Sequence, residues 1–417
     1  MDTLAGMSRA QLAQLGREYM LAAQFNSRTG YAALQMNHGP DAYLQTAIDN
    51  WLAASPVYSQ RMQRAMRTNE GSDIATILKG MQLECGLSHQ YFDAGMQEVS
   101  ACEGIFWLNS CGPLLETEPR GEAAVKTMCH DIEDPTFDAT AVATNPRARV
   151  RPIHRPPRVP ADRVPHCKWQ VTIEPDAEPL QESALTGFMR ETALAQLAIE
   201  RLPGDGSGGL DYYNGPLFQT LQLERFSQPA LVTICKELAV QIHLLVNSLG
   251  HVVNKRYGAD AGRAVSAFQF IGSGGVMSER LVRFLGSEGG GIDVVIDVLR
   301  IHPAFQPREY FGLEVQKLGQ QTARLTFGGG VASRETLSLG WYPLLRDGDA
   351  EGLSAIVKGV DRRAQIKPVD GADLAWDVVL DAAADDVEEP LAVQIAKGTV
   401  LYQTKLENHL QLIELQD

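Results

Sequence analysis

Three cysteines in the first half of the chain, Cys111, Cys129 and Cys167, are the residues whose types and spacing could do chemistry. Cys129 follows a short helical pattern and is followed directly by His130 and Asp131. A histidine beside a thiol can lower the thiol pKa and exchange a proton with it, and the thiolate is the reactive form of cysteine. We therefore predict a catalytic site in which Cys129 is the nucleophile, His130 is its proton partner, and Asp131, Cys111 and Cys167 lie nearby.

The same three thiols could instead hold a metal ion. Zinc and iron–sulfur clusters are bound by cysteine, in some sites together with histidine. Cys111 and Cys129 are separated by 18 positions and Cys129 and Cys167 by 38, and the chain has no C-x-x-C pair. The spacing does not choose between a nucleophile and a zinc or iron–sulfur site, and packing of the thiols in a core is a third interpretation.

Four residues are expected to bind the substrate. Arginine can hold a carboxylate through two parallel hydrogen bonds, which makes Arg151 and Arg155 candidates. His166 directly precedes Cys167 in a segment with strand-like alternation, so only one of these two side chains should face the site. Trp169 is expected to form a wall of the pocket.

Matches at a constant offset predict an internal duplication. Gly39 and Asp41 correspond to Gly258 and Asp260 at an offset of 219, the difference between 258 and 39. The same offset relates Ser59, Arg61 and Arg64 to Ser278, Arg280 and Arg283, and Tyr91-Phe92 to Tyr310-Phe311. This period is far longer than the roughly 20 to 50 residues of solenoid repeats, so it indicates two copies of one domain.

Only the first copy carries the thiols. Alignment of the later segments places Cys111 opposite Trp341, Cys129 opposite Asp361 and Cys167 opposite Leu374. Because other residue types occupy the equivalent places, a role in packing alone is weakened for these cysteines.

The spacing of apolar residues predicts helices over 9–67, interrupted at 37–40, and over 73–83. A short helix is predicted over 121–128, ending at Cys129, and each copy is expected to close with a helix, over 180–202 and 391–415. Alternating patterns predict strands over 97–108 and 168–174.

These elements predict an α+β fold made of two duplicated domains. In each domain helices pack on an antiparallel sheet, and pseudo-two-fold symmetry is expected to relate the domains as in a fused dimer. The predicted boundaries are 1–202 for the cysteine-bearing domain, 203–227 for a glycine-rich linker, and 228–417 for the copy without these cysteines.

Charge and composition narrow the classes of partner. Thirty-seven basic and 51 acidic side chains give a formal charge of −14, which disfavours nucleic acid. The chain shows no secretory pattern at its start, and its most apolar stretch, 231–253, contains charged residues and is typical of a buried helix. We expect a cytoplasmic protein with free thiols, a small-molecule substrate, no nucleic-acid partner and no membrane association; a homo-oligomer is compatible with the sequence.

Two segments carry a resemblance to a known family. The run from Cys111 to Phe137, CGPLLETEPRGEAAVKTMCHDIEDPTF, and the run from Asp162 to Ile173, DRVPHCKWQVTI, resemble the L-2-amino-thiazoline-4-carboxylic acid hydrolase family. The resemblance covers the first 200 residues, with Gly112 inserted in the Cys-Pro segment and extra residues between Asp162 and Cys167. It implies hydrolysis of a C–N or related bond in a small cyclic or amide-like acid, with the thiols at the site.

A more distant similarity leads to a different function. Helices followed by a cysteine-bearing sheet are similar to the vinyl-reductase-type small-molecule-binding domains of bacterial regulators, which implies a ligand sensor. The sequence thus predicts a thiol-dependent hydrolase without a cofactor. The alternative is a non-catalytic small-molecule-binding or metal-binding module, with zinc or an iron–sulfur cluster on the three cysteines. A shared fold does not decide between them.

Overall fold

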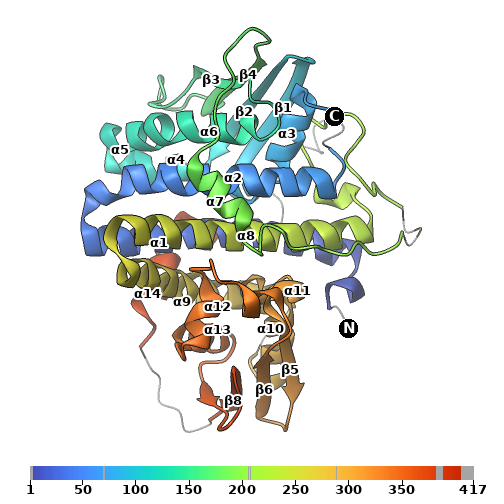
Figure 1. Cartoon of the computed structure of the whole chain (residues 1–417), viewed down its shortest axis with the longest axis vertical. Helices are drawn as coiled ribbons and strands as arrows, with labels where there is room; N and C mark the ends of the chain where they lie inside the picture. Colours follow the sequence, from blue (N-terminus) through green and yellow to red (C-terminus); the bar gives the residue numbers. More distant parts are fainter. Residues whose placement is uncertain are drawn as a thin grey trace.

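Four long helices cross the middle of the protein, and a four-stranded antiparallel sheet lies at each end (Figure 1). This arrangement is seen in a computed structural model that describes residues 3–68, 71–204, 206, 208–287, 289–381 and 388–404. The long helices are α1 (Arg9–His38), α2 (Tyr43–Ala65), α8 (Gln228–Tyr257) and α9 (Ala259–Phe284). The prediction of an α+β fold with antiparallel sheets is confirmed.

Equivalent signals begin and end the first helix of each half. The side chains of Ser8 and Ser227 accept hydrogen bonds from backbone N–H groups in the first turns of α1 and α8. Both helices have 30 residues and end at a glycine with positive φ, 81° at Gly39 and 94° at Gly258. This backbone conformation is easy only for glycine and turns the chain into the next helix.

The first sheet has the strand order β1-β2-β4-β3. Its strands are β1 (Phe92–Ser100), β2 (Glu103–Cys111), β3 (Ala148–His154) and β4 (Cys167–Ile173). The helices that accompany it are α3 (Ile74–Gln82), α4 (Gly112–Thr117), α5 (Glu122–Lys126), a π-helical turn (Thr127–Ile132), α6 (Glu133–Val142) and α7 (Ala184–Glu191).

The second sheet has the corresponding order β5-β6-β8-β7. Its strands are β5 (Leu313–Lys317), β6 (Thr322–Phe327), β7 (Ala364–Pro368) and β8 (Ala375–Leu380). The accompanying helices are α10 (Ile292–Ile301), α11 (Arg308–Phe311), α12 (Trp341–Arg346), α13 (Glu351–Val360) and α14 (Leu391–Lys397).

Several predicted boundaries are wrong. The segment 97–108 is an antiparallel hairpin of β1 and β2 with Ala101 and Cys102 at the turn. The helix predicted over 180–202 is only α7, because Thr192 takes an extended conformation that ends it. The short helix does not stop at Cys129, since the π-helical turn carries it on into α6. Of the helix predicted over 391–415, α14 covers the first seven residues, and the part beyond residue 404 lies outside the described residues.

One hydrophobic core joins the two halves. Its buried residues come from all four long helices, including Phe25 of α1, Tyr58 of α2, Leu238 of α8 and Phe270 of α9. Helix α8 is long and apolar enough to cross a membrane by length and composition, and its most apolar window is entirely buried inside the protein. Burial of this window explains its apolar composition, and the buried Lys236 and Glu237 of α8 form ion pairs.

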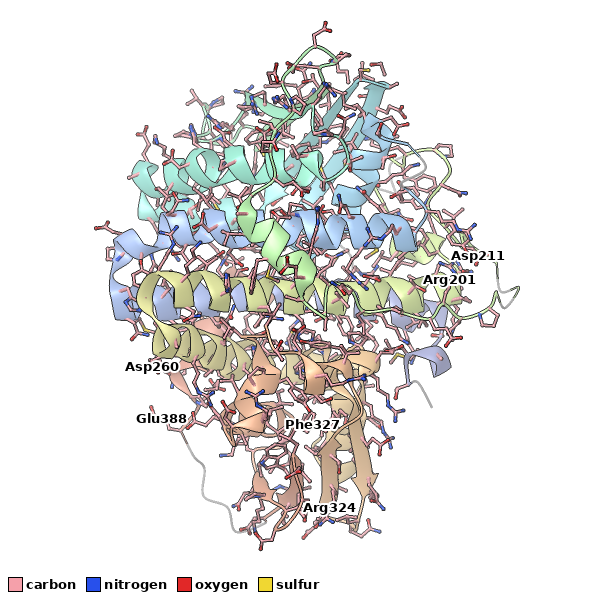
Figure 2. All side chains as sticks on the ribbon, viewed as in Figure 1. Arg201, Asp211, Asp260, Arg324, Phe327 and Glu388 are labelled. Carbon is pink, nitrogen blue, oxygen red and sulfur yellow. The ribbon has the colours of Figure 1, made fainter. Side chains whose placement is uncertain are left out.

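The segment between the halves packs into this core. Tyr213, Leu223 and Phe226 are fully buried, and the hydroxyl group of Tyr213 donates a hydrogen bond to the side chain of Gln82 on α3. The side chain of Arg201, just before this segment, donates a hydrogen bond to the carbonyl oxygen of Asp211 (Figure 2). Residues 210–227 of the predicted linker therefore take part in the packing of the first half.

Two buried arginine–glutamate pairs connect the halves. Arg61 of α2 binds both carboxylate oxygens of Glu237 of α8 at 3.0 and 2.9 Å. Arg280 of α9 binds both oxygens of Glu18 of α1 at 2.5 and 2.9 Å, and both side chains are fully buried. Arg61 and Arg280 differ by 219 positions, as do Glu18 and Glu237, so each half gives an arginine to the other half and receives one from it.

Removal of one partner of the inner pair should destabilise the whole fold. We expect Arg280→Met to lower the free energy of unfolding by about 3–5 kcal/mol, because it leaves the buried Glu18 carboxylate unpaired. The double variant Glu18→Met with Arg280→Met should recover much of this loss. The matched control is Arg324→Met, which breaks an exposed two-bond pair with Asp377 and should cost much less stability than Arg280→Met. Urea unfolding measures all three, and equal effects of Arg280→Met and Arg324→Met would contradict the expectation.

Candidate ligand cavity and thiol cluster

The three predicted cysteines lie together. Cys111 is the last residue of β2, Cys167 is the first residue of β4, and Cys129 lies in the π-helical turn. All three are at most 3% exposed and belong to one hydrophobic cluster with Phe106 and Trp169. The two strands meet at this end of the sheet, because Cys167 pairs with Leu108 of β2. Cys129 of the turn after α5 lies close enough to Cys111 and Cys167 to interact electrostatically with both.

The environment keeps these thiols protonated. Burial raises the pKa of Cys129, and Glu133, Cys111 and Cys167 raise it further. Burial and the neighbouring Cys167 and Glu133 hold the pKa of Cys111 well above its ordinary value. Burial, followed by Glu133, raises the pKa of Cys167 to about 12. A reactive cysteine needs the opposite shift, so the net effect of the described surroundings on each of these three thiols disfavours the thiolate.

The predicted proton partners of Cys129 point elsewhere. The Nε2 atom of His130 lies 2.7 Å from the carbonyl oxygen of Pro156. Asp131 forms an ion pair with Lys126 at 2.6 Å, largely in solvent. Among the described residues, neither side chain is hydrogen-bonded to Cys129. The acidic group that acts on the thiols is Glu133, which the sequence prediction did not include in the site.

The described part of the chain contains no group of three His, Cys, Asp or Glu side chains arranged to hold a metal ion. The thiols share a cluster with Val125, Leu114 and other apolar side chains. Buried thiols in such surroundings are typical of packing.

The residues predicted to bind substrate are spread over the neighbourhood of the cluster. Trp169 is fully buried and stacks on Phe106, with 6.1 Å between ring centroids. Arg155 pairs with Asp134, and its guanidinium carbon lies 5.8 Å from the Trp169 ring centroid. Trp169 is thus a core residue, and the guanidinium group of Arg155 lies near its ring.

His166 and Arg151 have different surroundings. The Nδ1 atom of His166 accepts a hydrogen bond of 3.2 Å from the backbone N–H of Cys111, and Nε2 lies 3.2 Å from Arg158. Burial, together with the charge of Arg158, lowers the pKa of His166. Arg151 pairs with Asp138, and its side chain is 55% exposed on the outer side of β3. His166 therefore fixes the end of β2, whereas Arg151 faces solvent.

A partly open cavity of about 130 Å³ lies beside the thiol cluster. Helices α1 and α2 form one side, and the β1–β2 hairpin and α6 form the other. Its apolar and aromatic wall is made by Tyr31, Tyr43, Ala47, Trp51, Tyr58, Met81, Leu87, Phe92, Phe106, Leu108, Pro113, Met128, Ile132 and Phe137. Phe106 and Leu108 belong also to the thiol cluster, so the cavity and the cluster share a wall.

A larger pocket of about 690 Å³ adjoins this cavity on the outside. The two spaces share Arg28, Tyr31, Tyr43, Pro113 and Met128 as lining residues, so these side chains stand between the interior and the surface. The outer pocket is lined in part by residues 395–399 of the second half, which complete its wall.

Arg28 is the charged group at this boundary. It donates hydrogen bonds to Glu116 at 2.6 Å and to the hydroxyl group of Tyr91 at 3.0 Å. Burial opposes its charge, but Tyr91 and Glu116 outweigh burial and hold its pKa above the ordinary value. The ring of Tyr91 packs directly on the backbone of Gly112, where a Cβ atom on residue 112 would lie 2.0 Å from a ring carbon. Glycine at position 112 thus allows Tyr91 to hold Arg28.

Two carboxyl groups give the cavity a polar interior. Burial raises the pKa of Glu133 to about 8, although Arg155 lowers it in part. Its Oε2 atom is buried without a hydrogen-bond partner in the described structure. Burial also raises the pKa of Glu84 to about 8, and Ser59 donates a hydrogen bond of 2.6 Å to it. At neutral pH both carboxyl groups are mostly protonated, so each can donate as well as accept a hydrogen bond.

The equivalent space in the second half is filled. Phe270, the counterpart of Trp51 at the 219-residue offset, stacks on Trp341 with 5.0 Å between ring centroids. His243 packs against the edge of Trp341 at 5.3 Å, and all three side chains are buried. At the same offset, the second half has glycines at the positions of two tyrosines that line the cavity of the first half.

These tyrosines separate the first two helices. Tyr31 and Tyr43 meet edge to face at 5.1 Å, and their counterparts are Gly250 and Gly262. A Cβ atom on Gly262 would lie 2.8 Å from the carbonyl oxygen of Gly250, so α8 and α9 approach directly. The contrast between tyrosine and glycine at one offset is the sequence signal that could have located the cavity.

Comparison of the chain with protein-family models, with curated proteins and with solved structures found no match.

Stability should fall as pH rises, because the folded protein keeps protons on Glu84 and Glu133 that the unfolded chain releases near pH 4.5. The contribution of each group is fully present below that pH and is lost as pH rises through about 8, at roughly 1.4 kcal/mol per unit of pKa difference. We expect Glu133→Gln to flatten this profile, and Glu122→Gln, at the exposed start of α5, to leave it unchanged. Urea unfolding between pH 4 and pH 9 tests this, and a profile that Glu133→Gln does not alter would rule out the protonated state.

Proposed function

We propose that this protein binds a small, uncharged, partly aromatic molecule in the cavity of its first half. The observation that carries this proposal is an apolar cavity with two protonated carboxyl groups, one of which has an unpartnered buried oxygen. Sites for small molecules are commonly apolar spaces with a few convergent polar groups. This is the binding-module alternative of the sequence analysis, without a metal.

The size and charge of the space define the ligand class. A cavity of about 150 Å³ with apolar walls can hold a benzene ring, so the inner cavity fits one ring or a short chain. Glu133 can hydrogen-bond a hydroxyl or N–H group of the ligand. Arg28, the basic residue in the lining of the inner cavity, is already neutralised by Glu116, so this cavity does not favour an anion. The outer pocket offers a route from solvent past Tyr43 and Met128.

We also propose that the two halves descend from one duplicated domain, with units 1–202 and 228–417 joined by 203–227 and related by pseudo-two-fold symmetry. The equal lengths and capping residues of α1 and α8, the equivalent strand orders and the reciprocal ion pairs support this origin. In this arrangement the first half keeps the cavity, and the second half is a scaffold.

A thiol-dependent hydrolase is the second candidate, favoured by the convergence of three thiols beside a titratable glutamate. It would require a bound substrate to lower the pKa of Cys129, since the free protein keeps this thiol protonated. The thiol cluster and the cavity share Phe106 and Leu108, so a ligand in the cavity would lie near the sulfur atoms.

Indole and phenol should bind to the protein, whereas benzoate, an anion of similar size, should bind at least tenfold more weakly. Ala47→Leu should abolish binding, because the added carbons occupy the cavity, and should also raise stability by about 0.5–2 kcal/mol. Ala10→Phe on the exposed face of α1 is the control and should change neither quantity. Isothermal titration and urea unfolding measure both, and unchanged binding by Ala47→Leu would reject the site.

Cys129→Ser separates the two candidates. Under the binding proposal it should leave the affinity for indole within about twofold, because the thiol only packs against the wall. Elemental analysis of the purified protein should show no stoichiometric zinc or iron. Hydrolysis of a cyclic C–N substrate that Cys129→Ser abolishes, and that the wild-type protein performs without added metal, would establish the hydrolase instead.

A further inference from the structure

The outer edges of the two sheets differ in what covers them. Strands β1 and β5 occupy the same edge position in their sheets. In the first sheet, Met96 of β1 lies opposite Phe106 of β2, and Phe106 pairs with Trp169 of β4. In the second sheet, Val315 of β5 lies opposite Leu325 of β6, and Leu325 pairs with Trp376 of β8. Met96 and Val315 are therefore equivalent positions on the two edges, and their numbers also differ by 219.

In the first half, the edge is covered by residues 215–219 of the connecting segment. The backbone N–H of Met96 donates a hydrogen bond of 2.8 Å to the carbonyl oxygen of Gln219. Two side chains of α3 hold the same segment: Lys79 donates to the carbonyl oxygen of Gly215 at 2.5 Å, and Gln82 donates to that of Phe218 at 2.7 Å. The side chain of Leu217 packs against the hydrophobic cluster of the first sheet.

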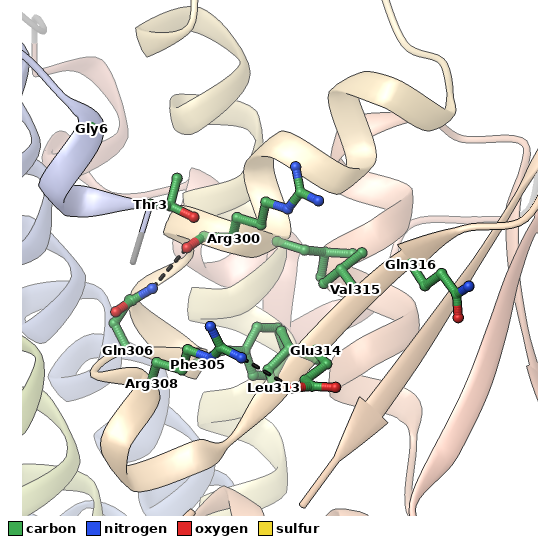
Figure 3. Close-up of a pocket in the computed structure, with 11 residues that line it drawn as sticks. Thr3, Gly6, Arg300, Phe305, Gln306, Arg308, Leu313, Glu314, Val315 and Gln316 are labelled. Atoms are coloured by element: carbon green, nitrogen blue, oxygen red, sulfur yellow. Dashed lines mark hydrogen bonds and ion pairs between the residues drawn. The ribbon is translucent and has the colours of Figure 1, made fainter. Parts of the chain in front are cut away.

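In the second half, the equivalent edge borders an open groove of about 610 Å³ (Figure 3). The groove is lined by Leu313, Glu314, Val315 and Gln316 of β5 and, on the opposite side, by Leu299, Arg300, Phe305, Gln306 and Arg308. In the described structure no backbone group pairs with the N–H of Val315 on this side. In an antiparallel pair, alternate residues do not exchange hydrogen bonds with the neighbouring strand, and their backbone N–H and C=O groups point away from it. Met96 is such a residue on β1, and Val315 is its equivalent on β5.

Gln306 supplies a second unsatisfied group in the groove. Its Nε2 atom donates to the carbonyl oxygen of Arg300 at 2.7 Å, as the dashed line in Figure 3 shows. Its Oε1 atom is buried and has no partner among the described residues, and the side chain as a whole is 6% exposed. A buried amide oxygen without a donor is costly, and rotation of the Gln306 side chain toward the groove would let a bound molecule donate a hydrogen bond to it.

We propose that this groove binds an extended peptide of another protein, which adds a strand to the edge of β5. The covered edge of the first sheet indicates the chemistry of the occupant: an uncharged segment with leucine and phenylalanine side chains, like residues 216–221. Arg308 on the rim is paired with Glu314 at 3.1 Å, so Arg300 is the charge that disfavours basic peptides. Backbone pairing at a sheet edge supplies affinity, and the groove beside it selects the side chains.

The test uses the intact protein and a fluorescent synthetic peptide with the sequence of residues 214–222, NGPLFQTLQ. We expect saturable binding in fluorescence anisotropy and slower amide hydrogen exchange in residues 313–317. Methylation of the peptide nitrogens should weaken binding at least tenfold, because it removes the donors without any change to the protein. Val315→Pro should weaken binding by about tenfold, since it removes one outward N–H from an edge strand, where proline is tolerated.

Three outcomes would overturn the proposal. Equal binding of the methylated and unmethylated peptides would show that strand pairing does not take place. Concentration-dependent dimerisation that protects residues 313–317 and excludes the peptide would assign the groove to a second copy of the chain. Protection of the same amides in the monomer without peptide would assign it to another segment of this chain. Binding of indole in the first half is independent of all three, because the groove lies on the second sheet.

Discussion

The reciprocal ion pairs of Arg61 with Glu237 and of Arg280 with Glu18 constrain the rest of the structure. Each guanidinium group binds a carboxylate through two bonds and gives its remaining nitrogen to a backbone carbonyl oxygen, that of Ala195 or Thr404. A charge buried among apolar helices is tolerated only when its partner is in place. The pairs therefore fix α2 against α8 and α9 against α1, and they require both halves to fold as one core.

Within this frame the two halves use their interior in opposite ways. Tyr31 and Tyr43 hold the first helix pair apart over a cavity, whereas Gly250 and Gly262 let the second pair close. Trp341 and Phe270 then fill the space that remains. The large shared core contributes most of the buried apolar surface, so the first half can keep a cavity and two protonated carboxyl groups that would destabilise a smaller domain.

The same asymmetry applies to the outer edges of the sheets. Residues 215–219 of the connecting segment cover the edge of β1, and the carbonyl oxygen of Gln219 accepts a hydrogen bond from the backbone N–H of Met96. The outer groups of β5 have no such partner in the described structure and border a groove instead. Exposed edges are prone to pairing with other chains, and β5 is short, with charged residues at Glu314 and Lys317 that limit this tendency.

The sequence by itself determined the helix hairpins, the alternating strands and the offset between the halves, because these follow from local periodicity, capping residues and repeated spacing. The nearness of the three cysteines was a hypothesis at that level, because their spacing does not require it. It led to Cys129, His130 and Asp131 as reacting groups because they are adjacent in the chain. Only the tertiary structure decided that His130 and Asp131 turn away, that the thiols stay protonated, and that Glu133, Arg28 and Trp51 line a cavity. A pKa and a cavity depend on which side chains exclude water from a site, and those side chains come from helices and strands far apart in the sequence.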